Sequence, residues 1–231
     1  MVQVKNVTIS IIIPCLNEAS FLEDTIKNCL RLPGIFEVIV VDGGSSDNTL
    51  SIAKKFDNIQ IYTTGKGRAT QMNYGAGKAI GNILLFLHAD TLLPENAYKL
   101  ITQQLQKSEY VGGSFRLKID KHHPFLNLYS WCSRFSVEFF TYGDHAIFIK
   151  KEVFTSIKGF KNISCMEDIE IQHRLRKRGK FKKVKDYVLT SGRRFEKNGT
   201  FKQLTLDVIL VFLYNLTIHP NHLKRFYSDH S

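Results

Sequence analysis

The fold of this chain is decided by Ile83-Leu84-Leu85-Phe86-Leu87-His88-Ala89-Asp90, an uncharged apolar run that ends abruptly in His88 and Asp90. A run that is apolar on both faces predicts a strand buried inside a parallel sheet. In open α/β sheets the ligand binds at the carboxyl ends of such strands, so Asp90 is expected where chemistry takes place. A single aspartate in this position is equally explained as the cap of the next segment. The ends of the other strands favour the first interpretation.

Two earlier apolar segments end in the same way. Residues 8–14 form a β-branched run that is closed by Pro14, and Asn17 and Glu18 follow it. Residues 37–42 form a second run, which finishes on Asp42 and is followed by a glycine- and serine-rich turn containing Asp47. Carboxyl ends of parallel strands meet at one edge of a sheet, so these polar side chains are expected to lie together there.

Helical segments separate the predicted strands. Ser20-Phe21-Leu22-Glu23 has the form of a capping box and predicts a helix that reaches about Leu32. Residues 49–56 predict a second helix, and a small-residue stripe in residues 68–79 predicts a third that packs closely on the sheet. This alternation through residue 107 predicts an α/β, Rossmann-like, mostly parallel sheet with right-handed crossovers and helices on both faces.

The pattern changes after Lys107. Residues 111–119 alternate from Ser114 onward, as a half-exposed antiparallel strand would, residues 125–140 favour a helix, and residues 146–149 favour a short strand. Because no linker separates the two parts, we expect one domain over residues 1–231, with residues 108–200 as a mixed extension of the sheet and residues 201–231 as an apolar helix and tail.

Composition limits the function without choosing it. A chain of 231 residues with 43% hydrophobic and 23% charged residues is globular, and its net charge of +11 indicates an anionic partner. That partner could be a nucleotide diphosphate, a nucleic acid or an acidic membrane surface. The four cysteines lack the C-x-x-C spacing of a metal or redox site, and residues 1–6 lack a signal sequence, so we expect reduced thiols in a cytoplasmic protein.

The C-terminal segment 201–218 is apolar on most of its circumference, which is unfavourable in water. Its apolar part, residues 204–218, is short for a membrane span. The helix is therefore expected either to pack on the domain or to lie on a membrane surface.

Four ordered motifs carry a resemblance to a known family. They are Pro14-x-x-Asn17-Glu18, the segment from Val41 to Thr49, the strand-ending His88-Ala89-Asp90, and Glu167-Asp168 followed by Gln172-x-Arg174-Leu175-x-x-x-Gly179. Together they resemble the signature of family 2 glycosyltransferases, which have the GT-A fold, and the match spans about residues 8 to 179. The resemblance implies metal-dependent, inverting transfer of a sugar from a UDP- or GDP-linked donor to a hydroxyl acceptor, with Mg²⁺ or Mn²⁺ as cofactor. It also implies that residues 1–107 bind the nucleotide and that residues 108–200 form the acceptor side.

The resemblance assigns roles at the strand ends. Asp42 would contact the nucleobase, Glu18 and Pro14 would line the nucleoside pocket, and Asp90 corresponds to the metal-binding aspartate of the family's D-x-D motif. His88 departs from that motif, because it stands where the first acidic residue is expected. A neutral imidazole still hydrogen-bonds a ribose hydroxyl, but the metal site loses one carboxylate. A structural histidine is the alternative.

The pair Glu167-Asp168 resembles the family's acidic pair, in which the aspartate is the general base. A hydroxyl that attacks an anomeric carbon must lose its proton, and a shielded carboxylate is suited to accept it. The structural alternative is that Asp168 only caps the helix that runs to Arg178.

Further residues complete the expected site. Arg68 opens a helix whose first amides favour an anion, and Arg193 and Arg194 lie in a predicted late loop, 191–195, that would fold over the diphosphate. A solvated arginine and a surface charge pair are the alternatives. The donor set also includes Asn17 and Asp47, and the acceptor side is assigned to Tyr142, Asp144 and His145.

Two other functions remain open at this point. A nucleotidyltransferase would share the sheet, although Pro14 to Glu18 contains no glycine of a phosphate loop. A non-enzymatic binder of nucleic acid or another anion would account for the charge. The resemblance favours a compact bacterial subgroup without transmembrane segments, located in the cytoplasm or at the inner face of the membrane, with a lipid among the candidate acceptors and no nucleic acid as partner.

Overall fold

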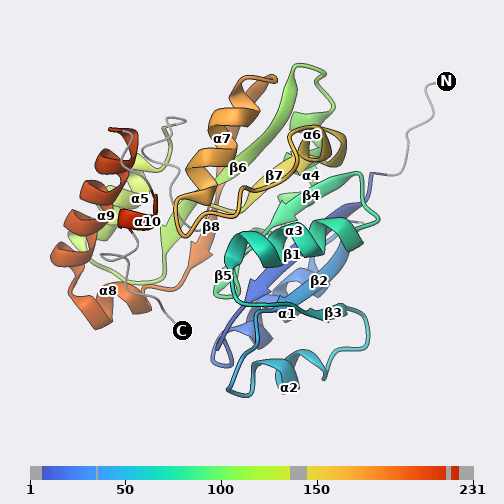
Figure 1. The fold of residues 1–231 in the computed structure, drawn as a ribbon, viewed down its shortest axis with the longest axis horizontal. Helices are drawn as coiled ribbons and strands as arrows, with labels where there is room; N and C mark the ends of the chain where they lie inside the picture. The colour runs from blue at the N-terminus through green and yellow to red at the C-terminus, as the bar shows by residue number, and fades with distance from the viewer. Residues whose placement is uncertain (1–6, 35, 136–144, 217–219, 224–231) are drawn as a thin grey trace.

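The computed structural model describes residues 7–34, 36–135, 145–216 and 220–223 (Figure 1). The strands are β1 (Ile9–Cys15), β2 (Phe36–Asp42), β3 (Gln60–Thr63), β4 (Ile83–Phe86), β5 (Thr91–Leu92), β6 (Tyr110–Ile119), β7 (Ile147–Lys150) and β8 (Lys180–Thr190). The helices are α1 (Leu22–Arg31), α2 (Thr49–Ala53), α3 (Arg68–Lys78), α4 (Ala97–Leu105), α5 (Pro124–Cys132), α6 (Lys151–Ser156), α7 (Glu167–Arg176), α8 (Arg193–Asn198), α9 (Thr200–Asn215) and α10 (Pro220–Leu223).

The described strands form one mixed sheet in the order β3-β2-β1-β4-β7-β6-β8-β5. Strands β1 to β4 pair in parallel, which confirms the predicted α/β half with its crossover helices. β7 then pairs antiparallel with both β4 and β6, so β4 lies at the boundary between the parallel and the mixed halves. Because β1 pairs in parallel with both β2 and β4, the carboxyl ends of these three strands lie at one edge of the sheet.

Strand β4 is shorter than the apolar run predicts. Leu87 still donates its N–H to the carbonyl of Ile12 at 3.0 Å, but the strand ends at Phe86. In this parallel register the next bond would come from the N–H of Pro14 to the carbonyl of Leu87, and proline has no N–H to donate. The ladder therefore stops, and His88 and Asp90 lie in the connection to β5.

The second half differs from the expectation in two segments. β6 is antiparallel to β7, in agreement with the antiparallel strand predicted for residues 111–119, but it is parallel to β8, a strand that the sequence patterns do not predict. β8 is not apparent in the sequence because lysines occupy much of it, and one of them, Lys183, is buried and donates to the carbonyl of Ser133 at 2.7 Å. Residues 193–198 form α8, where a loop was expected.

The predicted capping box at the start of α1 is wrong. The helix begins at Leu22, and no side chain bonds to its free amides. The carbonyl of Glu18 accepts the N–H groups of Phe21 and Leu22 instead, and the Glu23 carboxylate pairs with Lys27 at 2.6 Å. The other helices also end earlier than predicted: α2 stops at Ala53 and α5 at Cys132, while residues 136–140 lie outside the described residues.

Helices cover both faces of the sheet. One apolar core joins the sheet to α1, α4 and α5, and a second joins it to α3, α6 and α7. The predicted small-residue stripe of α3 is buried, and a Cβ at Gly75 would come within 2.6 Å of the Ile12 side chain. α3 therefore lies unusually close to β1 and β2.

The C-terminal helices form a third, smaller core at one end of the molecule, at the left in Figure 1. Leu210 and Val211 of α9 are buried there against Met166 and Ile169. Among the described residues, no helix combines the length and the apolar character needed to cross a membrane. All four cysteines are free thiols, as predicted, and three of them are buried.

Candidate active site at the carboxyl ends of the strands

The loops after β1 and β2 are joined by side-chain hydrogen bonds. The N–H of Asn17 donates to Ser45 Oγ at 2.9 Å, and Asn17 Oδ1 accepts the N–H of Ser46 at 2.9 Å. Asn17 has a φ of 55°, a left-handed conformation that asparagine tolerates better than most residues. Asn17 therefore holds the two loops in register.

Asp42 is almost fully buried at the end of β2. Its Oδ2 accepts the N–H groups of Gly44 at 2.9 Å and Ser45 at 3.0 Å, which fixes the carboxylate within the turn. Burial, and then the negative charge of Asp42, raise the pKa of the neighbouring Cys15 thiol well above its ordinary value. Cys15 is thus an inert packing residue and not a nucleophile.

Asp47 also stabilises the turn. Its carboxylate accepts the N–H of Thr49 at 2.9 Å and the N–H of Ala19 at 3.2 Å. Partial burial raises the pKa of Asp47, but the hydrogen bonds from Thr49 and Ala19 outweigh that effect and hold the pKa below its usual value. Its predicted contact with a donor stays a prediction.

Arg193 joins two of the predicted acidic residues. Its Nη2 lies 2.6 Å from Glu18 Oε1 and 3.2 Å from Asp90 Oδ2. The guanidinium carbon also lies 4.6 Å from the centroid of the Phe21 ring, in a cation–π contact. Residues that are far apart in the sequence therefore meet around one cation, and the start of α8 reaches the loops after β1 and β4.

These carboxylates fit a divalent cation. Mg²⁺ and Mn²⁺ prefer oxygen ligands and take few from protein when phosphate oxygens supply the others. Glu18 Oε2 is buried and has no hydrogen-bond partner among the described residues, so it retains an unused acceptor. Among the described residues, no group of three or more acidic, histidine or cysteine side chains is arranged to hold a metal ion. A metal bound at Asp90 would compete with Arg193 for the carboxylate.

Glu167 and Asp168 are the first two residues of α7, and both are largely buried. The N-cap position belongs to Met166, whose φ of 65° is left-handed, so the interpretation of Asp168 as the helix cap is wrong. Arg68 at the start of α3 pairs with Glu167, with 3.5 Å between Nη1 and Oε1. A left-handed methionine costs conformational energy, and such strain is common at functional sites.

The start of α3 connects this acidic pair to the strand ends. Three residues after Arg68, Gln71 Nε2 donates to the carbonyls of Cys15 and Val41 at 2.8 Å each. Gln71 thereby fixes α3 against the ends of β1 and β2, and the same helix turn presents Arg68 to α7. The predicted helix start at Arg68 is confirmed, whereas the contact of Gln71 with the strand ends is a tertiary interaction that the sequence does not predict.

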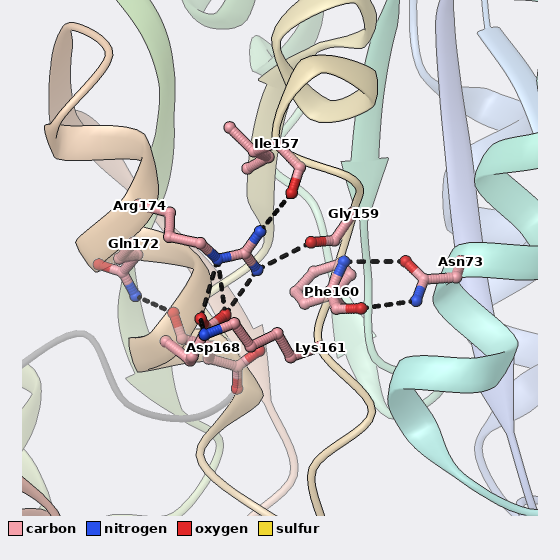
Figure 2. A network of polar contacts seen from close by, with 9 residues as sticks. Asn73, Ile157, Gly159, Phe160, Lys161, Asp168, Gln172 and Arg174 are labelled. Atoms are coloured by element: carbon pink, nitrogen blue, oxygen red, sulfur yellow. Dashed lines mark hydrogen bonds and ion pairs between the residues drawn. The ribbon is translucent and has the colours of Figure 1, made fainter. Parts of the chain in front are cut away.

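A network of polar contacts anchors α7 (Figure 2). Arg174 donates to both carboxylate oxygens of Glu170 and to the carbonyls of Ile157 and Gly159, and Lys161 pairs with Glu170 at 2.8 Å. Burial raises the pKa of Glu170, but the hydrogen bonds from Arg174 and Lys161 lower it by more than burial raises it. The pKa of Glu170 therefore lies below its usual value. Glu170 and Arg174 stand four residues apart on a helix, and this spacing could have indicated the pair from the sequence.

Asn73 completes the network from α3. Its side-chain amide exchanges two hydrogen bonds with the backbone of Phe160, at 2.8 and 2.9 Å (Figure 2). α3 therefore holds the segment before α7 as well as the ends of β1 and β2.

Of the remaining predicted site residues, some make contacts away from the strand ends and others are outside the described part of the chain. Arg194 pairs with Asp207 of α9 at 2.7 Å, so its observed contact is within the C-terminal helices. His145 is fully buried and its Nδ1 lies 3.1 Å from the carbonyl of Phe115. His88 is half-buried between β4 and β5. Tyr142 and Asp144 lie outside the described residues.

A hollow of about 700 Å³ lies at a different place on the molecule. It is lined by residues at the start of β4 and of α6, including Asn82, Ile83 and Lys151. This is the amino end of a parallel strand, and none of the predicted site residues lines the hollow.

The first half of the sheet is parallel and Rossmann-like, and the sheet continues through an antiparallel pairing at β7. Acidic residues lie at or after the ends of β1, β2 and β4. These features define the class of GT-A glycosyltransferase folds. The chain belongs to Glycosyl transferase family 2, which it matches over residues 10–161. The expected fold class and family are thereby confirmed.

Similar proteins carry related names. A "PGL/p-HBAD biosynthesis glycosyltransferase" of Mycobacterium bovis (strain BCG / Pasteur 1173P2) is 43% identical over 93 residues, which cover 37% of this chain and 36% of that protein. An "Undecaprenyl-phosphate 4-deoxy-4-formamido-L-arabinose transferase" of Proteus mirabilis (strain HI4320) is 31% identical over 124 residues, 48% of this chain and 38% of that protein. The match spans little more than a third of the length of either relative.

Solved structures share the fold at low sequence identity. The mannosyltransferase PcManGT from Pyrobaculum calidifontis, in complex with GDP-Man and Mn²⁺, superimposes with a TM-score of 0.65 at 19% identity, over 80% of this chain and 57% of that one. S. aureus TarS 1-349 in complex with UDP-GlcNAc gives a TM-score of 0.66 at 15% identity, over 96% of this chain and 71% of that one.

Proposed function

We propose that this protein is a metal-dependent, inverting glycosyltransferase that moves a sugar from a nucleotide-diphosphate sugar to a hydroxyl acceptor. The observation that carries the proposal is the contact of one guanidinium, that of Arg193, with both Glu18 and Asp90. Such a set of charges suits an anionic diphosphate together with a cation. Family membership favours sugar transfer over nucleotidyl transfer or plain anion binding.

The donor would bind across the ends of β1, β2 and β4. Asp42 would accept a hydrogen bond from the nucleobase, Pro14 and Glu18 would line the nucleoside site, and Asn17 and Asp47 would hold the surrounding loops. UDP- and GDP-linked sugars are the proposed donors, since the neighbours with this fold were solved with GDP-Man and UDP-GlcNAc.

Asp90 would hold Mg²⁺ or Mn²⁺, with His88 at the ribose. The metal, when bound, supplies positive charge that stabilises the leaving diphosphate. Arg193 would add a second positive charge to the same oxygens, and Arg194 stays a candidate for the diphosphate.

Asp168 would serve as general base. The acceptor hydroxyl attacks the anomeric carbon from the face opposite the diphosphate, its proton passes to Asp168, and the bond from the anomeric carbon to the diphosphate oxygen breaks. Attack from the opposite face inverts the configuration. Glu167, which Arg68 pairs with, would position the start of α7 and with it Asp168.

We propose a lipid-borne hydroxyl as the acceptor, at the inner face of the membrane. The name of the Proteus mirabilis relative, which includes undecaprenyl-phosphate, supports a lipid as the carrier of the acceptor group; the group named there is a phosphate, whereas the hydroxyl follows from the proposed reaction. Tyr142, Asp144 and His145 remain the proposed acceptor side, with His145 acting through the backbone of β6 that it contacts.

Two substitutions test the roles separately. Asp168→Asn should lower turnover of a UDP- or GDP-sugar by roughly 10²- to 10⁴-fold, as expected for loss of a general base, and leave nucleotide affinity unchanged. Asp90→Ala should weaken the binding of UDP or GDP in the presence of Mn²⁺, measured by calorimetry. Asp57→Ala, at an exposed position between α2 and β3, is the matched control and should change neither quantity.

Wild-type turnover in both variants would refute the assignment of the site. Equal loss of nucleotide affinity in both variants would refute the assignment of separate roles to Asp90, as the metal ligand, and Asp168, as the general base.

A further inference from the structure

We propose that α5 and α9 together form a docking surface for an anionic lipid bilayer. Large apolar side chains are exposed at thirteen described positions, and nine of these lie on or directly after the two helices. The nine, here called the lipid face, are Phe125, Leu128, Trp131, Phe135, Phe201, Val208, Ile209, Phe212 and Leu216. Such a concentration of exposed apolar side chains marks an interaction site.

The lipid face is one continuous surface. On and just after α5 the members recur every three or four residues. On and just after α9 they stand at positions 201, 208, 209, 212 and 216, which also fall on one side of a helix with 3.6 residues per turn. The two stripes meet at Phe125 and Phe201, whose ring centroids are 6.0 Å apart, and Trp131 contacts Phe135 at 5.5 Å. Figure 1 shows α5 and α9 together at the end of the molecule farthest from β3.

The buried side of α9 sets the orientation of the helix, and with it which residues are exposed. Leu210 and Val211 are buried in the C-terminal core, and Asp207 is buried and paired with Arg194. Because that face is occupied, Phe201 and Phe212 remain exposed, at 69% and 57% of their surfaces. The helix therefore has two apolar sides, of which one is buried and the other is exposed among the described residues.

Charge selects the occupant. The sequence of α5 contains no acidic residue, and Asp207, the single acidic residue of α9, is buried. The exposed cations are Arg134, whose guanidinium carbon lies 4.6 Å from the Trp131 ring, and Lys202 beside Phe201. Phosphate headgroups complement such cations, and tryptophan is enriched at lipid interfaces.

A second copy of the chain fits this surface less well. Pairing of two lipid faces would bring the same cations together in a protein with a net charge of +11. An amphipathic helix that lies in the plane of a bilayer has instead the composition seen here, with aromatic and aliphatic residues inward and basic residues at the rim.

The lipid face is connected to the proposed active site through α8. Arg193 of α8 contacts Glu18 and Asp90, and the next residue, Arg194, pairs with Asp207 of α9. A bilayer bound to the exposed side of α9 would thus be linked to the site through α9 and the Arg194–Asp207 ion pair on its buried side. This connection makes the surface suited to an acceptor carried by a lipid.

Vesicle co-sedimentation of the full chain tests the docking surface. We expect binding to phosphatidylcholine vesicles that contain phosphatidylglycerol, and weaker binding to phosphatidylcholine alone. Trp131→Ser with Phe212→Ser should lower the binding constant by roughly tenfold or more, since each removes a large apolar contact. Arg134→Gln with Lys202→Gln should lower it by roughly fivefold for each cation.

Two matched variants serve as controls. Ile80→Ser removes the most exposed isoleucine at a position off the two helices, and Lys54→Gln with Lys107→Gln removes the same charge from other exposed positions. Both should bind vesicles as the wild type does. Absence of vesicle binding, or equal loss in the controls, would overturn the proposal.

A dimer that dissociates in the Trp131→Ser, Phe212→Ser variant, detected by analytical ultracentrifugation, would overturn it in favour of self-association. The binding assay needs no sugar donor, so its outcome is independent of the proposed transferase activity.

Discussion

Arg193 is the side chain that brings the two ends of the chain into one site. Its guanidinium is shared between Glu18 and Asp90, carboxylates that are both largely buried. Charge-assisted hydrogen bonds of this kind are stronger than neutral ones, so the arginine holds Asp90 in the absence of a metal. A metal bound at Asp90, as proposed, would therefore compete with the guanidinium for the same oxygen atoms.

This competition predicts that removing Arg193 raises the affinity for the metal, whereas loss of a residue that binds the metal would lower it. Arg193→Gln should raise the affinity for Mn²⁺ alone by roughly tenfold, because a charged hydrogen bond to the ligand no longer has to be broken. The same variant should weaken the binding of UDP or GDP when Mn²⁺ is saturating. Mn²⁺ binding is measured by electron paramagnetic resonance without nucleotide.

Lys197→Gln is the control for Arg193→Gln, because it removes the same charge from an exposed position on α8. It should leave Mn²⁺ affinity unaltered. An equal rise in both variants would mean that overall charge, and not the contact with Asp90, controls the metal.

At the scale of elements, α3 organises the site. Its Gln71 bonds to the ends of β1 and β2, its Asn73 holds the segment before α7, and its Arg68 pairs with Glu167. These contacts require close approach of α3 to the sheet, which Gly75 permits. Glycine is a poor helix former, but at position 75 the close packing of α3 on β1 and β2 offsets this cost.

Two glycines of α3 should therefore respond in opposite directions to the same change. Gly75→Ala should lower the free energy of unfolding by roughly 1–3 kcal/mol, because the new methyl group would lie 2.6 Å from the buried Ile12 side chain. Gly77→Ala meets no atom within 4 Å and should raise it by up to about 1 kcal/mol. Urea unfolding curves measure both, and destabilisation by Gly77→Ala would contradict the packing argument.

For the whole molecule, the Glu170 network joins helices from both parts of the chain. Arg174 and Glu170 of α7 hold residues 157–161, which Asn73 binds from the first half (Figure 2). Breaking a buried ion pair leaves an uncompensated charge, so the network should contribute to global stability.

The lowered pKa of Glu170 fixes the pH dependence of this contribution. Its ordinary value is 4.5, so the stabilisation is complete above about pH 4.5 and is lost as the pH falls through the lower pKa of the folded state. Glu170→Gln should lower the free energy of unfolding by about 2 kcal/mol at pH 7, as expected for the loss of hydrogen bonds to a charged group, and the difference from wild type should shrink in acid. Thermal unfolding between pH 7 and pH 3 measures this difference.

Glu23→Gln is the control, because Glu23 forms an exposed pair with Lys27 in α1. It should leave the midpoint of unfolding nearly unchanged across the same pH range. A pH-independent effect of Glu170→Gln would exclude the ion pair as the source of the stabilisation.

Much of the first half followed from local sequence patterns. Apolar runs with β-branched residues predicted β1, β2 and β4, and the small-residue stripe predicted α3, because periodic burial is written into neighbouring residues. The end of β4 was mispredicted, because it depends on Pro14 of another strand. β8 was not predicted, because its many lysines do not form the apolar pattern of a strand. Its place in the sheet comes from its pairing with β6, which is distant in the sequence.

The sequence by itself determined that this chain forms an α/β sheet of the family 2 type, with Asp42 and Asp90 close behind strands. Only the tertiary structure decided that Arg193 lies between Glu18 and Asp90, that Met166 and not Asp168 occupies the N-cap position of α7, and which side of α9 is exposed. The physical reason is range: helix and strand propensities act between near neighbours, whereas ion pairs and buried faces depend on which distant segments the fold brings together.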